Sequence, residues 1–374
     1  MVKLPKGLIN IESTEVPSYY EIAVPLFERC NLNCSFCFES HSNLEIDCDY
    51  ILSIPHKIIE QVKKDLEDSD LTIIKLRLWG GELFFDALDD SIFVMYRKFI
   101  NTFHELVQKH LPGKKVHIEY LSNGVFTKYK RVDSLLKDTN GTIAFSYDPV
   151  NRFSCDQQKE IWLKTVNYFK DKTRCISITL TKQSIAAYIA GDPYFEKIPK
   201  NISVDINYYM ANENWEEHIL SDDDIFNFYK WCVDNKKYNI HTLDTIFRYF
   251  VEGEKEHIER HCNCNGKYSV QFTNGVCEKD CAKRSSSLNR ELFYGKYTDE
   301  TTPDNVSAIK TSLGISKRGC LYCEHYDHCT MFCWISIIFS GFKATNCPLR
   351  RIYNYITHEQ VEDFKKWRTF NGKN

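Results

Sequence analysis

The chain has 374 residues, of which 43% are hydrophobic and 26% are charged, and its net charge is −3. This composition is ordinary for a soluble globular protein, and the length exceeds what one hydrophobic core usually supports, so we expect one large domain and one smaller one. The balanced charge argues against a nucleic-acid-binding protein. The longest apolar run, Met331 to Phe342, is shorter than the roughly 20 residues that cross a bilayer, so we expect no membrane-spanning helix.

Between residues 20 and 235, six β-rich runs alternate with helical patterns. The expected strands are Tyr20–Phe27, Leu71–Trp79, Lys115–Leu121, Thr142–Tyr147, Cys175–Leu180 and Ser203–Tyr209. The expected helices are Ile51–Leu66, Ser91–Leu111, Val132–Lys137, Glu160–Phe169, Ile185–Ile198 and Asp224–Val233. Strand–helix units in series predict an α/β fold with a parallel sheet, because parallel neighbours need long crossover connections. Periodicity alone leaves open whether the sheet closes into a barrel.

The pattern changes after Gly253, where regular alternation stops. Lys267–Thr273 followed by Asn274-Gly275 predicts a β-hairpin. The polar segment 285–318 has no sustained period and is expected to be mostly loop. Thr357 and Gln360 predict a capping box that opens a helix with apolar positions at Val361, Phe364 and Trp367.

Sixteen cysteines are the unusual feature of the composition, and nine of them fall between Cys262 and Cys347. The N-terminus lacks the apolar core of a signal peptide, so we expect a cytoplasmic protein. In that compartment, thiols grouped as C-x2-C indicate metal binding rather than disulfides.

The most informative group, Cys30-x3-Cys34-x2-Cys37, directly follows the first expected strand. This spacing lets one loop give a thiolate to each of three irons of a 4Fe–4S cluster and leaves the fourth iron open for chemistry. The alternatives are a zinc site with His41 as fourth ligand, a redox C-x2-C pair or a chance grouping.

This segment resembles the radical S-adenosylmethionine superfamily, whose signature is C-x3-C-x2-C with an aromatic residue before the last cysteine, here Phe36. A second match is Trp79-Gly80-Gly81-Glu82, at the carboxyl end of the second expected strand. Glycines allow the backbone to approach a ligand closely, and the Glu82 carboxylate can receive the ammonium group of S-adenosylmethionine.

The resemblance implies further cofactor contacts at strand ends, where sites of parallel sheets gather. Asn123, Ser146 and Thr179 are the candidates for the ribose, and Ser146 matches the family well. Arg152 is the candidate for the carboxylate, although it follows Ser146 more closely than in many relatives. The backbone of Phe36 is expected to contact the adenine. Each of these residues also has an ordinary structural interpretation as part of a turn or strand end.

The implied fold is a partial (β/α)6 TIM-type barrel followed by a C-terminal cysteine-rich SPASM domain. The implied ranges are an N-terminal extension (1–19), the radical core (20–250), the SPASM domain (251–356) and a C-terminal helix (357–374). The implied chemistry is reductive cleavage of S-adenosylmethionine to a 5′-deoxyadenosyl radical, which takes hydrogen from the substrate. An electron donor such as flavodoxin or ferredoxin is implied as a partner.

The C-terminal cysteines match the SPASM signature C-x2-C-x5-C-x3-C…C, which carries two auxiliary 4Fe–4S clusters. By this match, one cluster takes Cys320, Cys323, Cys329 and Cys347. The other takes Cys264, Cys281, Cys333 and either Cys262 or Cys277. This second set departs from the family, because five residues rather than four separate Gly275 from Cys281, and Ala282 stands where relatives often have a catalytic aspartate. Structural zinc is the alternative.

Members of this subfamily mostly modify peptides or protein side chains, so the resemblance implies post-translational maturation of a ribosomally made peptide. About nineteen residues precede the first strand, too few for an independent leader-binding domain. We therefore expect a separate binding partner or the auxiliary domain to recruit the peptide. The alternatives are a small-molecule substrate such as a sugar, nucleoside or amino acid, and a non-catalytic metal-binding protein. No catalytic base is identified.

Overall fold

The computed structural model describes residues 19–37, 45–67, 71–208, 220–252, 269–273, 275–278, 323–325, 329 and 346–370. The barrel elements are β1 (Tyr19–Pro25), α1 (Cys48–Glu67), β2 (Ile73–Trp79), α2 (Asp90–His110), β3 (Lys115–Ser122), α3 (Tyr129–Asp138), β4 (Thr142–Tyr147), α4 (Asp156–Tyr168), β5 (Thr173–Leu180), α5 (Lys182–Ile189), η1 (Phe195–Lys197) and β6 (Ser203–Tyr208). After them come α7 (Asp222–Asp234), α8 (His241–Glu252), β7 (Ser269–Thr273), β8 (Val276–Glu278), α12 (Pro348–Tyr355) and α13 (His358–Phe370).

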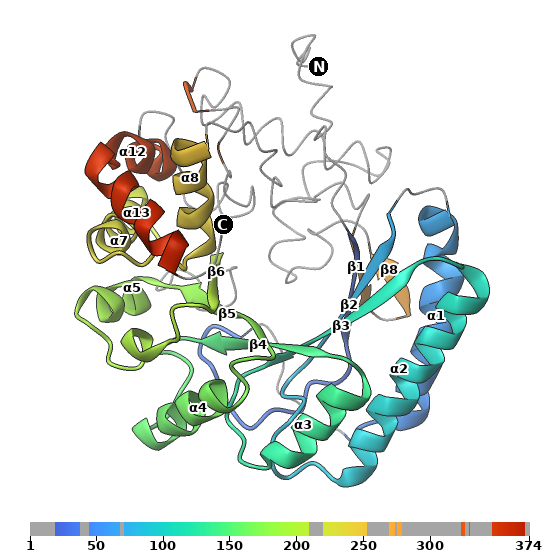
Figure 1. Ribbon diagram of the computed structural model, residues 1–374. Helices are drawn as coiled ribbons and strands as arrows, with labels where there is room; N and C mark the ends of the chain where they lie inside the picture. Colours follow the sequence, from blue (N-terminus) through green and yellow to red (C-terminus); the bar gives the residue numbers. More distant parts are fainter. Residues whose placement is uncertain are drawn as a thin grey trace, which may run out of the picture.

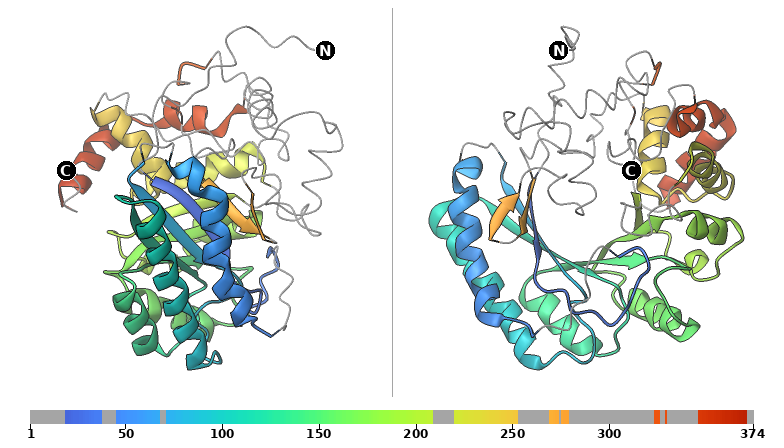
Figure 2. Two further views of the ribbon diagram at one scale, coloured as in Figure 1. Left: turned by 90° about the vertical axis from the view of Figure 1, so that its right-hand side faces the viewer. Right: turned by 180° about the vertical axis from the view of Figure 1, so that it is seen from behind.

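The sheet has the order β6-β5-β4-β3-β2-β1-β7-β8, and β1 to β6 are parallel. Figures 1 and 2 show these strands curved into an open half-barrel with α1 to α4 on its convex side. Among the described residues, β6 and β8 do not pair with each other, so the sheet stays open there. The α/β fold with a parallel sheet that curves as a partial barrel is thus confirmed.

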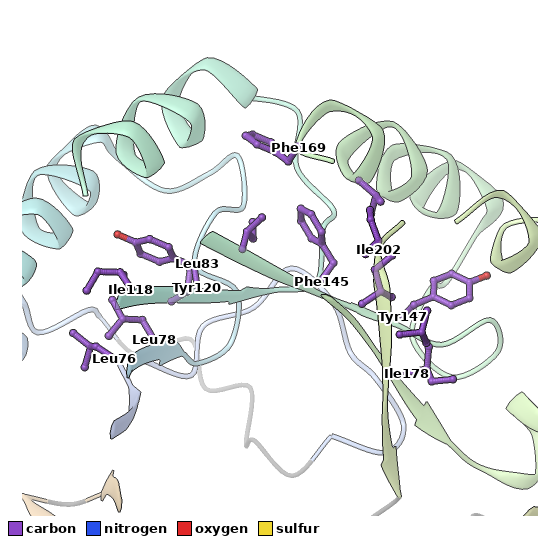
Figure 3. Packing of buried hydrophobic residues seen from close by; sticks show 14 of the residues in the cluster. Leu76, Leu78, Leu83, Ile118, Tyr120, Phe145, Tyr147, Phe169, Ile178 and Ile202 are labelled. Carbon is purple, nitrogen blue, oxygen red and sulfur yellow. The ribbon is translucent and has the colours of Figure 1, made fainter. Parts of the chain in front are cut away.

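The hydrophobic core lies between the sheet and the helices that cover it (Figure 3). Strand β2 illustrates the alternation that produces this layer, since successive side chains point to opposite faces. Ile74, Leu76 and Leu78 are 0% exposed on the helix side. Lys75 and Arg77 therefore lie on the inner, concave face. On β2, therefore, the apolar side chains face the helices and the charged side chains face the concave side of the sheet.

The predicted hairpin is present as β7 and β8, which pair antiparallel around Gly275. Strand β7 also pairs in parallel with β1, with Glu21 opposite Ser269 and Ala23 opposite Gln271. The side chain of Gln61 in α1 adds hydrogen bonds to the backbone of Gly275 and Cys277, of 2.9 and 2.8 Å. The hairpin, expected within the auxiliary domain, therefore shares the sheet of the barrel.

Helices α7, α8, α12 and α13 gather beside the β6 edge of the half-barrel (Figure 1). The predicted capping box opens α13: Thr357 N–H donates to Gln360 Oε1 (2.8 Å), and Gln360 N–H donates to Thr357 Oγ1 (3.4 Å). Phe364 and Trp367 of α13 pack on Tyr238. Helices α8 and α12 were not predicted from the sequence.

One predicted helix, Ile185–Ile198, is wrong in its second half. Helix α5 ends at Ile189, and only a short 3-10 turn, η1, follows. Gly191 has a φ of +86°, a left-handed conformation that ends helices, and Pro193 follows two residues later. Segment 285–318, for which a loop was expected, and the apolar run 331–342 lie outside the described residues. Over the residues described, no helix has the length and apolarity needed to span a membrane.

Candidate functional site

The loop that follows β1 carries the three predicted cysteines at the carboxyl edge of the sheet. Its tight turn is closed by the Cys37 N–H, which donates to the Cys34 carbonyl at 3.0 Å. Cys34 is 8% exposed, and Cys30 and Cys37 are half-buried. The structure therefore brings the three sulfurs into one loop at the end where sites of parallel sheets form.

Gly80 and Gly81 hold this loop against the end of β2. The Gly81 N–H donates to the Phe27 carbonyl (2.7 Å), and the Glu82 N–H donates to the Arg29 carbonyl (3.0 Å). A Cβ added at either glycine would overlap carbonyl oxygens of residues 27–29. These glycines thus permit a close approach to the backbone just before Cys30, and their predicted approach to a ligand stays a prediction.

Glu82 is completely buried, and its carboxylate joins the ends of β2 and β3. Oε1 accepts hydrogen bonds from Ser122 Oγ (2.7 Å) and the Phe84 N–H (2.9 Å), and Oε2 accepts from the Asn123 N–H. Burial raises the pKa of Glu82 to about 7, against these hydrogen bonds, which lower it. Both oxygens therefore have protein donors, and Oε2, which accepts a single bond, keeps an acceptor site for the cofactor ammonium group that the sequence predicts here.

The end of β3 contacts the cysteine loop through a pair of asparagines, Asn123 after β3 and Asn31 in the loop. Asn123 Nδ2 donates to Asn31 Oδ1 (2.8 Å) and lies 3.7 Å from Cys30 Sγ. Asn31 Nδ2 donates to the Val125 carbonyl at 2.7 Å. Sequence reasoning proposed Asn123 as a ribose contact but missed Asn31, which only its position next to Cys30 could have signalled.

The end of β4 forms the third attachment of the loop. Ser35 donates to Asn151 through its N–H (3.1 Å, to the carbonyl) and its hydroxyl (3.2 Å, to Oδ1). The Arg152 guanidinium lies over the Phe36 ring, 5.4 Å from its centroid. Asn151 was not predicted, because a single asparagine in a turn gives no functional signal.

Ser146 and Thr179 lie on β4 and β5, within the same half of the sheet. Their neighbours Phe145, Tyr147, Ile178 and Leu180 are buried on the helix side, as Figure 3 shows for the first three. By strand alternation, Ser146 and Thr179 face the concave side of the sheet. Ser146 is further held by its carbonyl, which accepts a hydrogen bond from buried Trp162 Nε1 at 3.0 Å.

The three thiols are suited to bind the positively charged core of a 4Fe–4S cluster as thiolates. Burial raises the pKa of Cys30 to about 11, and the charges of Glu82, Cys34 and Cys37 add to the shift. Such a thiol stays protonated at neutral pH unless a metal replaces the proton. No three His, Cys, Asp or Glu side chains of the described residues converge on one metal ion. A 4Fe–4S cluster makes a different demand, since each thiolate binds its own iron.

Below the strand ends, the concave face carries a network of five charged residues, which we call the ionic layer: Glu21, Lys75, Arg77, Glu119 and Arg174. Glu119 lies at its centre, with Arg174 at 2.6 Å, Arg77 at 2.7 Å and Lys75 at 3.1 Å. Although burial opposes the change, the charges of these cations lower the pKa of Glu119 to about 2. The interior of a (β/α)8 barrel is usually filled by branched apolar residues. In this protein, by contrast, the ionic layer makes the concave face of the sheet polar.

Three cysteines of the C-terminal C-x2-C-x5-C-x3-C…C pattern are described, Cys323, Cys329 and Cys347, and they lie near side chains of α12. Cys347 precedes its first residue, Pro348. Burial raises the pKa of Tyr353, and Cys329 and Cys323 add to this shift. Segment 323–325 is fixed to α12 by the paired bonds from Arg350 to Glu324 (3.1 and 2.8 Å). Cys277 lies in β8, and Cys262, Cys264, Cys281, Cys320 and Cys333 lie outside the described residues.

Comparisons with known proteins place this geometry in a known fold. No protein-family model and no curated protein sequence matches the chain. Among solved structures, native anSMEcpe with bound AdoMet matches with a TM-score of 0.56 and 15% identity, over 95% of this chain and 100% of that chain. The chain has the fold of anSMEcpe. Streptococcus suis SuiB bound to S-adenosylmethionine gives a TM-score of 0.44 at 17% identity, over 88% of this chain and 75% of that chain.

Proposed function

We propose that the protein is a radical S-adenosylmethionine enzyme with a SPASM-type C-terminal region. The observation that supports this most directly is the joining of two motifs far apart in sequence. The backbone just before Cys30 is hydrogen-bonded to Gly81 and Glu82, and their neighbour Asn123 reaches the Cys30 sulfur. The fold shared with anSMEcpe is consistent with this arrangement.

In this proposal, Cys30, Cys34 and Cys37 hold a 4Fe–4S cluster, which with S-adenosylmethionine supplies a carbon-centred radical that removes hydrogen from a substrate C–H bond. The contribution of the chain is to fix the cysteine loop on three strand ends at once, through Gly81, Asn31 and Ser35. Such rigidity positions reacting groups and limits the entry of water. Ser146, Thr179, Arg152 and the Phe36 backbone are the proposed cofactor contacts.

A peptide or protein is the proposed substrate class, modified after translation. The support for this class is the resemblance of the cysteine motifs to a subfamily whose members mostly modify peptides or protein side chains, and the fold shared with anSMEcpe is consistent with it. The polar concave face formed by the ionic layer suits a hydrated peptide backbone better than an apolar substrate. A separate leader-binding partner and a flavodoxin or ferredoxin electron donor remain part of the proposal.

Two auxiliary 4Fe–4S clusters complete the proposal. The set Cys320, Cys323, Cys329 and Cys347 is supported by the gathering of its three described members around α12. The other set is Cys264, Cys281 and Cys333 with Cys262 or Cys277. These clusters would relay electrons or bind the substrate.

The test is anaerobic reconstitution with iron and sulfide, followed by addition of S-adenosylmethionine and dithionite. We expect release of 5′-deoxyadenosine from the wild-type protein and none from Cys34→Ala, because the first cluster needs all three thiolates. Cys155→Ala, which removes an exposed cysteine, serves as the control and should keep full activity. Stoichiometric zinc without iron, or equal release from both variants, would overturn the proposal.

Substrate class needs a separate measurement. Peptides encoded by short reading frames next to this gene, rich in Cys, Trp or Tyr, are incubated with the active enzyme and examined by mass spectrometry and by chiral amino-acid analysis. A modified peptide supports maturation. Modification of a sugar, nucleoside or free amino acid, with all peptides unchanged, would replace the peptide by a small molecule.

A further inference from the structure

The side chain of Asn123 is fixed on every side. Its Oδ1 accepts a hydrogen bond from the Val125 N–H at 2.8 Å. One amide proton goes to Asn31 Oδ1 at 2.8 Å, and the other is directed to Cys30 Sγ at 3.7 Å. Asn123 is 5% exposed, so solvent offers no alternative partner for these groups.

The orientation of the amide follows from its partners. The Val125 N–H can only donate, so it requires the oxygen of Asn123 on its side. The nitrogen must then face Asn31 and Cys30. Asn31 is oriented in the same way, because its own nitrogen donates to the Val125 carbonyl. The N–H group that faces the Cys30 sulfur is therefore set by the network.

This network rests on the strand ends. The Asn123 N–H donates to Glu82, whose other oxygen holds Ser122. Asn31 belongs to the cysteine loop itself. Both amide protons of Asn123 have partners within the described residues, so a ribose oxygen could accept a proton from this amide only by displacing Asn31 or Cys30. The geometry favours a different role for this residue.

We propose that Asn123 is a positioning residue whose amide N–H, directed at Cys30 Sγ, raises the reduction potential of the cluster that Cys30 binds. This inference rests on the proposed function. The reduced cluster carries one more negative charge than the oxidised one. A hydrogen bond to a thiolate ligand stabilises the more negative state, because the donor dipole opposes the added charge. The Leu32 N–H, 3.4 Å from the same sulfur, adds a second donor. Cys34 Sγ has instead a carbonyl oxygen, that of Arg152, at 4.0 Å.

The test is a redox titration of the reconstituted protein, monitored by EPR. The EPR signal that is absent from Cys34→Ala identifies the cluster bound by Cys30, Cys34 and Cys37. Asn123→Leu removes the donor without adding charge, and Asn123→Asp preserves the shape and the acceptor for Val125. We expect Asn123→Leu to shift the reduction equilibrium about tenfold toward the oxidised cluster, which is about 59 mV for one electron. Asn123→Asp should shift it further in the same direction, because its carboxylate also adds a negative charge beside the sulfur. Asn151→Ala, which loosens the same loop at Ser35 without touching a sulfur, should leave the potential unchanged.

The outcomes separate this inference from the proposed function. A normal cluster signal with an unchanged potential in both Asn123 variants would overturn the role of Asn123 and leave the enzyme assignment intact. The absence of that signal from the wild-type protein would overturn the assignment itself. If the variants fail to assemble the cluster, wild-type protein labelled with ¹⁵N in asparagine side chains provides the answer. A ¹⁵N coupling to the reduced cluster in pulsed EPR is expected, and its absence would refute the contact.

Discussion

Ser122 donates its hydroxyl proton to Glu82 at 2.7 Å, and the same hydroxyl oxygen accepts from the Gly124 N–H at 3.0 Å. One buried serine thus connects the end of β2 to the turn that carries Asn123. Ser122→Ala removes both bonds and leaves the Gly124 N–H unpaired. We expect a loss of about 1–3 kcal/mol in the free energy of unfolding, measured with urea. Ser91→Ala, at an exposed position of α2, should change it by less than about 0.5 kcal/mol.

Gly81→Ala tests the attachment of the cysteine loop to β2. The added Cβ would overlap the carbonyl oxygens of Arg29 and Glu28, which are backbone atoms and cannot move aside cheaply. We expect a loss of about 3 kcal/mol in unfolding free energy, and less iron in the first cluster after reconstitution. Gly191→Ala is the control, because its φ of +86° is strained but nothing lies within 4 Å of the added atom. A Gly81→Ala protein as stable as the control would contradict the attachment.

The lowered pKa of Glu119 predicts that the free energy of unfolding decreases as the pH falls. Its pKa of about 2 lies below the ordinary value of 4.5, so the ionised form favours the folded state. This contribution, about 3 kcal/mol, is present above pH 4.5 and is lost as the pH falls toward 2. Glu119→Gln should therefore be much less stable than wild type at pH 6, and the difference should narrow below pH 4.5. Unfolding curves of wild type and Glu119→Gln between pH 6 and pH 3 measure the difference, and Glu105→Gln, at an exposed position of α2, is the control substitution.

Iron analysis tests the C-terminal assignment. The wild-type protein should bind about twelve irons if three clusters form, and Cys347→Ala about eight. The same variant should retain the first cluster and some release of 5′-deoxyadenosine. The exposed Cys155→Ala should bind as much iron as wild type. An unchanged iron content in Cys347→Ala would remove Cys347 from the ligand set.

Much of the barrel could be predicted because its signals are local. All six strands were located to within about two residues, since each is a short apolar run between polar turns. The capping box at Thr357 and the turn at Gly275 also depend only on adjacent residues. Helices α8 and α12 were missed although the sequence indicates both. In α8, Leu243, Ile246 and Phe247 are spaced along one helical face. In α12, Pro348 occupies the first helical turn, where proline is common.

The contacts of the candidate site are different, because they join residues far apart in the chain. Cys30, Gly81 and Asn123 could each be identified from motifs, but their partners could not. The bond from Asn123 to Cys30 spans 93 residues, and that from Ser35 to Asn151 spans 116. A motif indicates which residues matter, whereas only the folded sheet decides whether a carboxylate such as Glu82 faces a ligand or a neighbouring strand.

The pairing of β7 with β1 gives the strand that leads into the cysteine loop neighbours on both sides. A truncated protein ending after residue 252 would leave β1 as an open edge, with unsatisfied amides next to the loop that holds the three thiols. Such edges recruit strands from other molecules and promote aggregation. The two parts of the chain should therefore be produced together, since the first strand of the barrel is completed by residues made some 250 positions later.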